Sequence, residues 1–161
     1  ELGHRRIGYV VGPLDQQAGN DRLDGYRAAL TEFGIAIDPS FTVYGNDHFD
    51  SGFAAASELL NLDPRPTAIF CNNDEMAAGA CAAVFEGGLR VPEDVSIAGF
   101  DDIPLSRQIW PPLTTVRQPI SEMATRAAKL LVSVLKGQEP SDLAVEISTE
   151  LIVRKSTCAV K

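Results

Sequence analysis

The sequence lacks the features on which several classes of protein depend. No apolar run approaches the roughly 20 residues that a membrane-spanning helix needs, and the longest candidate is interrupted by Lys129. Positive charge is also scarce, with 14 Lys and Arg against 22 Asp and Glu. The resulting formal net charge of -8 repels a phosphate backbone. We therefore expect no membrane partner, and no contact with nucleic acid through these residues.

Catalytic and metal-binding patterns are equally sparse. His4 and His48 are the only histidines, and neither lies in an HExxH pattern. The chain contains no GxSxG nucleophile elbow, no phosphate-cradling glycine loop and no CxxC pair. Asp101 and Asp102 could form the acidic pocket of a metal-binding receiver domain, but its later Lys and further acidic ligands are missing. We therefore expect no catalytic residues, no metal and no cofactor.

The cysteines Cys71, Cys81 and Cys158 have neither metal-ligand nor redox spacing. Cys71 falls in a predicted strand and Cys81 on the apolar side of a predicted helix. An unpaired Cys in such a place behaves as a small hydrophobic residue. Reduced thiols favour a cytoplasmic location.

Strand and helix patterns alternate along the 161 residues, a length typical of one domain. Short apolar runs predict strands at 7–11, 41–44, 67–71 and 95–100. Each of the first three is followed by a helical pattern, and the links are short. This alternation predicts an α/β fold in which a parallel sheet carries helices on both faces.

The helices are predicted from apolar residues at helical spacing and from their stop signals. The first runs from about 21 to Gly34 and buries a stripe of Tyr26, Ala29, Leu30 and Phe33. The second is capped by Asp50 or Ser51 and closes before Pro64. The third buries Ala77, Ala80, Cys81 and Val84 and ends at Gly87-Gly88.

The last third of the chain follows a different pattern. Residues 101–118 form a Pro-rich connection without clear periodicity. A strongly amphipathic helix is predicted from Pro119 to Gly137, with one apolar face made of Ile120, Met123, Ala127, Leu130, Leu131 and Val134. Two short strands are predicted at 144–147 and 151–154.

Three predicted strand ends are unusually polar. The polar residues are Asp15, Gln16, Gln17, Asn20, Asp21 and Arg22 after the first strand, Asn72, Asn73 and Asp74 after the third, and Asp101 and Asp102 after the fourth. Ligands of open parallel sheets bind beyond the carboxyl ends of the strands. We therefore expect a binding site where these residues meet.

Arg22 and Asn73 extend the apolar stripes of their helices backward by one turn, so both point inward and need partners. The structural alternative is that Arg22 pairs with a carboxylate such as Asp101 and that Asn73 caps its own helix. A cation is mildly unfavourable at a helix N-terminus, which favours a special role for Arg22. Together, Arg, Asn and Asp suit the hydroxyls of a sugar or nucleoside. Phe49 and Trp110 are candidate ring platforms, with ordinary packing as the alternative.

Six segments resemble the LacI-type (LacI/GalR family) transcriptional regulators. They are GHRRIG at 3–8, RLDGY at 22–26, RPTAIFC at 65–71, VPEDVS at 91–96, GFDD at 99–102 and PLTTV at 112–116. The resemblance runs from about residue 3 to residue 156. Periplasmic sugar-binding proteins share the fold but usually lack VPEDVS and PLTTV.

For the fold, the resemblance implies a periplasmic-binding-protein-like (type I) core of two lobes that close on an effector. Residues 3–113 would form the C-terminal lobe, 114–140 the crossover and a helix of the missing N-terminal lobe, and 141–161 the return strands. The first residues resemble neither a signal peptide nor a translation start, so we expect a longer protein. The helix has lost its cover, and we expect it to pack on a second chain or against the remaining lobe.

For the site, the resemblance implies that Arg22 and Asp101 contact the effector, as Asn73 commonly does in sugar responders. Asp47 stands where an aromatic platform is common, so either Phe49 takes over the stacking or the ligand differs. Gln16 stands where purine responders carry a basic residue, which favours a sugar.

For the whole protein, the resemblance implies a cytoplasmic, homodimeric repressor. Operator DNA would be bound through a missing headpiece and not through this chain. The alternative is a periplasmic sugar-binding receptor of an uptake system, with an enzyme third. An upstream helix-turn-helix would support the repressor, and a signal peptide the receptor.

Overall fold

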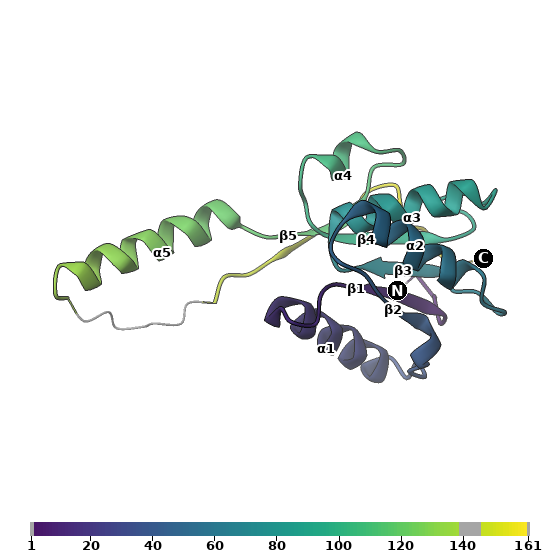
Figure 1. The fold of residues 1–161 in the computed structure, drawn as a ribbon, viewed down its shortest axis with the longest axis horizontal. Helices are drawn as coiled ribbons and strands as arrows, with labels where there is room; N and C mark the ends of the chain where they lie inside the picture. The colour runs from purple at the N-terminus through teal and green to yellow at the C-terminus, as the bar shows by residue number, and fades with distance from the viewer. Residues whose placement is uncertain (1, 139–145, 161) are drawn as a thin grey trace.

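The computed structural model describes residues 2–138 and 146–160 and is built around a sheet of six strands (Figure 1). The strand order is β2-β1-β3-β4-β5-β6. The strands β1 to β5 pair in parallel, and β6 adds to β5 in antiparallel register. The strand bounds are β1 Ile7–Val11, β2 Thr42–Tyr44, β3 Ala68–Cys71, β4 Ser96–Asp101, β5 Thr114–Arg117 and β6 Glu150–Ile152.

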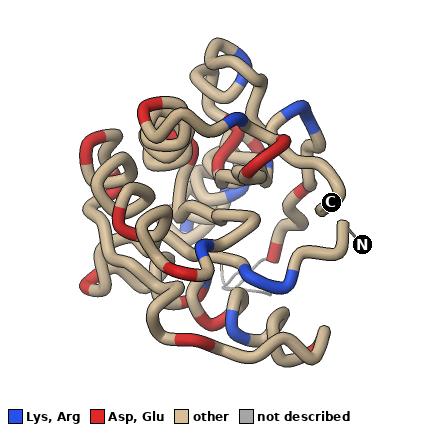
Figure 2. The backbone as a smooth tube through the Cα atoms, turned by 90° about the vertical axis from the view of Figure 1, so that its right-hand side faces the viewer, with Lys and Arg blue, Asp and Glu red and all other residues tan. Residues whose placement is uncertain are grey.

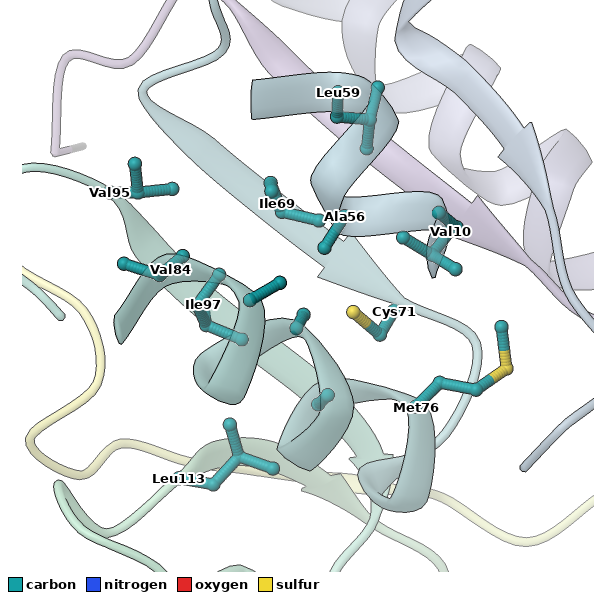
Figure 3. Packing of buried hydrophobic residues seen from close by; sticks show 14 residues of the cluster. Val10, Ala56, Leu59, Ile69, Cys71, Met76, Val84, Val95, Ile97 and Leu113 are labelled. Atoms are coloured by element: carbon teal, nitrogen blue, oxygen red, sulfur yellow. The ribbon is translucent and has the colours of Figure 1, made fainter. Parts of the chain in front are cut away.

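Helices cover both faces of the sheet, so the predicted layer arrangement is confirmed. On one face, α1 (Gln17–Glu32) packs Leu23, Tyr26 and Leu30 against Tyr9 and Val11 of β1. On the other face lie α2 (Phe49–Leu60) and α3 (Asp74–Glu86). Their side chains meet those of the strands in the larger core, which Figure 3 shows from close by.

Two helices differ in detail from the sequence prediction. The helix α1 begins at Gln17, four residues before the predicted start, and Phe33 is exposed because the buried stripe runs through Leu23 instead. In α2 neither predicted cap holds the helix start, which lies at Phe49. The Ser51 hydroxyl instead donates to the His48 carbonyl. In α3 the predicted stop at Gly87 is confirmed.

The Pro-rich connection is more ordered than its sequence indicates. It contains a short helix, α4 (Leu105–Gln108), and the strand β5. A period cannot show in a four-residue helix between prolines, which is why the pattern was missed. The predicted return strand at 151–154 is β6, shifted to Glu150–Ile152, because the chain then turns to bond β4 through Ser156. Of the strand predicted at 144–147, the first two residues lie outside the described residues, and the last two are not in a strand.

The amphipathic helix α5 (Ile120–Leu135) extends away from the sheet (Figure 1), and none of its residues is buried. Its apolar side chains Ile120, Met123 and Leu131 are 42–61% exposed. The expectation that α5 lies against the remaining lobe is therefore wrong, and packing on a second chain stays a prediction. No helix within the described ranges has the length and apolar character to cross a membrane.

Candidate functional site

Parallel pairing brings the predicted polar strand ends to one edge of the sheet. The ends of β1, β3 and β4 are neighbours there, and the loop after β2 folds over them. Side-chain bonds show that Arg22 of α1, Asp47 of this loop, Asn72 after β3 and Asp101 of β4 form one cluster. We call these four residues the edge cluster.

Arg22 is at the centre of the edge cluster. Its Nη1 donates to the Asn72 carbonyl at 3.1 Å, and its Nη2 lies 3.6 Å from Asp101 Oδ1. The guanidinium also lies over the Phe100 ring, 4.2 Å from the centroid, an arrangement that stabilises a cation. Because α1 begins at Gln17, Arg22 lies in the second turn, and the expected conflict with the helix dipole is wrong. Its predicted pairing with Asp101 is confirmed.

Asp101 ends β4 with a φ of 111°, a backbone conformation that L-residues rarely adopt. Its Oδ1 accepts from Gln118 Nε2 at 2.6 Å as well as facing Arg22. The pKa of Asp101 is raised above its usual value, chiefly because the carboxyl is buried. The hydrogen bond from Gln118 and the charge of Arg22 lower the pKa, and the charge of Asp47 raises it, so the net shift is upward. The carboxylate thus joins the edge cluster to the residue that follows β5.

Asn73 does what the structural alternative predicted. Its Oδ1 accepts from the Met76 amide at 2.8 Å and so caps α3. Its Nδ2 donates to the Asp47 carbonyl at 2.9 Å. Both halves of the amide are therefore engaged, and Asn73 fixes the loop that carries Asp47.

Asn72 is a residue whose role the sequence reasoning missed. It is 2% exposed, accepts from the Tyr9 hydroxyl and donates through Nδ2 to Asp47 Oδ1 at 2.7 Å. Residues two apart in a strand lie on the same side, so Asn72 lies on the same side of β3 as Phe70. Tyr9 stacks on Phe70, and this period of two is the sequence signal that could have placed Asn72 beside Tyr9. Asn72 thus positions Asp47 through its side chain and Arg22 through its carbonyl.

The remaining predicted site residues lie at different distances from the edge cluster. Gln16 is exposed at the start of α1, and its side chain makes no capping bond. Phe49 begins α2, two residues after Asp47, and is 39% exposed. Trp110 is not brought to this edge. It lines a pocket with Phe85 and Leu89, at the end of α3 opposite Asn73, so its proposed role as a platform is wrong.

Asp102, the residue after Asp101, forms a separate ion-pair network. Its Oδ2 accepts from Arg117 Nε at 2.7 Å, and its Oδ1 from Arg154 and from the Ser106 hydroxyl. Burial raises the pKa of Asp102, but the bonds from Arg154, Arg117 and Ser106 outweigh it and lower the pKa to about 2. Asp101 and Asp102 therefore face different partners, and within the described ranges no acidic, His and Cys cluster forms a metal pocket.

Asp74 is a third, fully buried carboxylate. It accepts from the Thr115 hydroxyl and from the Ile103 amide, which ties α3 to β5 and to the loop before α4. Burial raises its pKa to about 6, against the lowering effect of the two hydrogen bonds. Asp74 is fully buried and both of its oxygens are bonded within the protein, so we assign it a structural role.

The raised pKa of Asp74 predicts a stability that falls as pH rises from about 4 to about 6. The folded state holds the proton up to about pH 6, whereas the unfolded state loses it near the ordinary Asp pKa of 3.8. In Asp74→Asn, the side-chain oxygen can still accept from the Ile103 amide, and the side-chain NH2 can donate to the Thr115 hydroxyl. The variant therefore keeps both contacts but cannot titrate. Over this pH range, the free energy of unfolding of the wild type should fall by up to about 3 kcal/mol more than that of the variant. Urea melts at several pH values measure this difference, and parallel curves would contradict it.

The chain is similar to a known protein family and to several transcriptional regulators. A model of the periplasmic binding protein-like domain matches residues 1–157. The transcriptional repressor CytR of Escherichia coli is 42% identical over 160 residues, which cover 99% of this chain and 47% of that protein. The ribose operon repressor of Haemophilus influenzae is 37% identical and is covered to 48%. The chain spans about half the length of the curated relatives it matches.

Solved structures give the same result. A CelR-cellobiose complex superposes with a TM-score of 0.91 at 40% identity, covering 96% of this chain and 47% of that one. The dimeric Lac repressor superposes with a TM-score of 0.92 at 34% identity, covering 99% and 58%. The chain therefore belongs to the periplasmic binding protein-like domain family and is of the LacI type.

Proposed function

We propose that this chain is the effector-binding part of a transcriptional repressor and that a sugar binds at the edge cluster. The observation that carries the proposal is the pair of Arg22 and Asp101, held 3.6 Å apart at the carboxyl edge. The relatives named above are repressors or regulators rather than enzymes. They favour a regulator over an uptake receptor, and we propose that the chain catalyses no reaction.

The chemistry of the pair suits a hydroxyl group. A hydroxyl can donate to the Asp101 carboxylate while its oxygen accepts from the Arg22 guanidinium. Charge-assisted bonds of this kind are stronger than neutral ones. The 3.6 Å between Arg22 Nη2 and Asp101 Oδ1 is longer than a direct hydrogen bond. A ligand hydroxyl can therefore bind both side chains without breaking a tight ion pair.

We propose that the edge cluster is one wall of a cleft between two lobes. Residues 3–113 and 141–161 would form the lobe described here, while 114–140 would cross over and contribute α5 to the other lobe. The extension of α5 away from the sheet and its uncovered apolar face support this division. Effector binding would then shift the equilibrium between two lobe arrangements and so change DNA affinity.

DNA would be bound through a segment other than this one, in a cytoplasmic homodimer. In the view of Figure 2 the basic residues lie scattered among acidic ones, which does not suit a phosphate backbone.

An exposed apolar pair, Phe85 at 83% and Trp110 at 79%, is the surface we propose for contact with a second copy.

A thermal-shift screen of the intact protein against a sugar library tests the proposed function. A sugar that binds the folded state raises Tm in a concentration-dependent way. The proposal predicts at least one such sugar, recovered chemically unchanged after incubation. A screen in which no sugar raises Tm, or in which the bound sugar is converted, would contradict it.

A further inference from the structure

The Asp47 carboxylate lies in the same wall as Arg22 and Asp101. Asp47 has a φ of 69°, and its loop is fixed because Asn73 Nδ2 donates to its carbonyl at 2.9 Å. Its Oδ1 accepts from Asn72 Nδ2 at 2.7 Å, and Asn72 is itself fixed by the Tyr9 hydroxyl. The carboxylate is therefore held in one place before any ligand arrives.

The end of β1 leaves room for this arrangement. A Cβ added at Gly12 would lie 2.7 Å from Asp47 Oδ1 and 2.1 Å from Asn72 Nδ2. Real Cβ atoms are essentially never found that close to other atoms, so glycine is required for the carboxylate to reach over β1. Asp47 is thus built into the wall by Gly12, Asn72 and Asn73 together.

The wall carries more negative than positive charge. Arg22 is its central cation and faces Asp101, while the bonds that Asp47 accepts within the described residues come from amides. The next guanidinium, Arg117, is bound by Asp102 and Glu150. Asp21 adds a further exposed carboxylate on α1, where it accepts from Gln17. Asp47 and Asp101 therefore bring two negative charges to the edge cluster, and Arg22 brings one positive charge.

We infer that Asp47 makes the proposed site selective for uncharged, hydroxyl-rich ligands and against their phosphorylated forms. The inference rests on the proposed function and adds the class of ligand. One carboxylate oxygen of Asp47 accepts the hydrogen bond from Asn72, and the other accepts a hydrogen bond from a hydroxyl of the ligand. A phosphate brought to the same wall meets the uncompensated carboxylate at short range, where like charges repel.

Calorimetric titration of the intact protein with matched pairs of probes tests the inference. The probes are ribose, glucose and uridine, each against its terminal phosphate ester. For any pair that binds, the neutral member should bind at least about 10-fold more tightly than its ester, the effect of one like-charge contact. In Asp47→Asn this ratio should fall by about 3- to 10-fold, because the amide keeps an acceptor and loses the charge. Glu58→Gln removes one charge from the exposed surface of α2 and should leave the ratio unchanged.

The outcomes separate the two claims. An ester that binds as tightly as its neutral partner, or a ratio unchanged in Asp47→Asn, overturns the inference and leaves the sugar site standing. If no probe binds, the sugar that raises Tm in the screen and its phosphate ester replace them as the matched pair, and a screen without any such sugar contradicts the proposed function itself. If melting curves show that Asp47→Asn does not fold, the wild-type ratio is measured at about 20 mM and about 500 mM NaCl. If charge repulsion causes the preference, the ratio of the two affinities should be smaller at the higher salt concentration. A ratio that does not depend on salt overturns the inference.

Discussion

Replacing Arg22 by Ala should weaken effector binding by the intact protein about 10- to 150-fold, the equivalent of about 1.5–3 kcal/mol for a charge-assisted hydrogen bond. The side chain is 19% exposed and joins the Asn72 carbonyl, the Asp101 carboxylate and the Phe100 ring. Its loss removes the guanidinium that faces the Asp101 carboxylate. Calorimetry with the sugar found in the thermal-shift screen measures the change.

Arg27→Ala is the matched control for this experiment. Arg27 is on the same helix, is about half exposed and pairs with Asp24 at 3.6 Å. Arg27 carries the same charge as Arg22 but lies outside the edge cluster. The affinity of Arg27→Ala for the sugar should therefore equal that of the wild type. Unchanged affinity in Arg22→Ala would remove Arg22 from the site.

Replacing Asp102 by Ala should lower the free energy of unfolding by about 3–5 kcal/mol, the cost of breaking a buried ion pair. The Asp102 side chain is 2% exposed and that of Arg154 is 13% exposed. Without the carboxylate, the Arg154 guanidinium keeps only Ser106 and the Leu113 carbonyl as partners. The buried charge is then uncompensated, and the bridge through Asp102 between Arg117 of β5 and Arg154 after β6 is lost.

Chemical denaturation of wild type and variant measures this loss. Asp24→Ala removes a carboxylate from an exposed pair and should cost less than about 1 kcal/mol. Equal losses in the two variants would show that the Asp102 network does not stabilise the fold. The pH dependence gives a second readout, because the stabilisation by Asp102 is present above about pH 4 and is lost as pH falls through about 2.

The strands and the main helices could be predicted because their signals are local. Ile7–Val11 is an apolar run that ends at a Gly-Pro pair, and its bounds are those predicted. The pairing of Arg22 with Asp101 was also accessible, since parallel strands end at one edge and helix periodicity turns Arg22 inward. These inferences need only the period of each element and the rules of sheet topology.

The features that were missed depend on contacts between distant segments. The role of Asn72 depends on which side of β3 faces Tyr9, a matter of register between β1 and β3. Trp110 was assigned to the wrong end of the sheet because no period fixes the course of the Pro-rich connection. The position of α5 depends on what packs against its apolar face, which its own residues do not specify.

The most direct test of the central claim joins the sugar site to DNA binding. Fluorescence anisotropy measures the affinity of the intact protein for the proposed operator DNA, with and without the sugar found in the screen. We expect the sugar to change the operator Kd of the wild type and of Arg27→Ala. At the same sugar concentration it should leave the Kd of Arg22→Ala nearly unchanged. A full response in Arg22→Ala would show that the effector acts somewhere other than the edge cluster and would contradict the account.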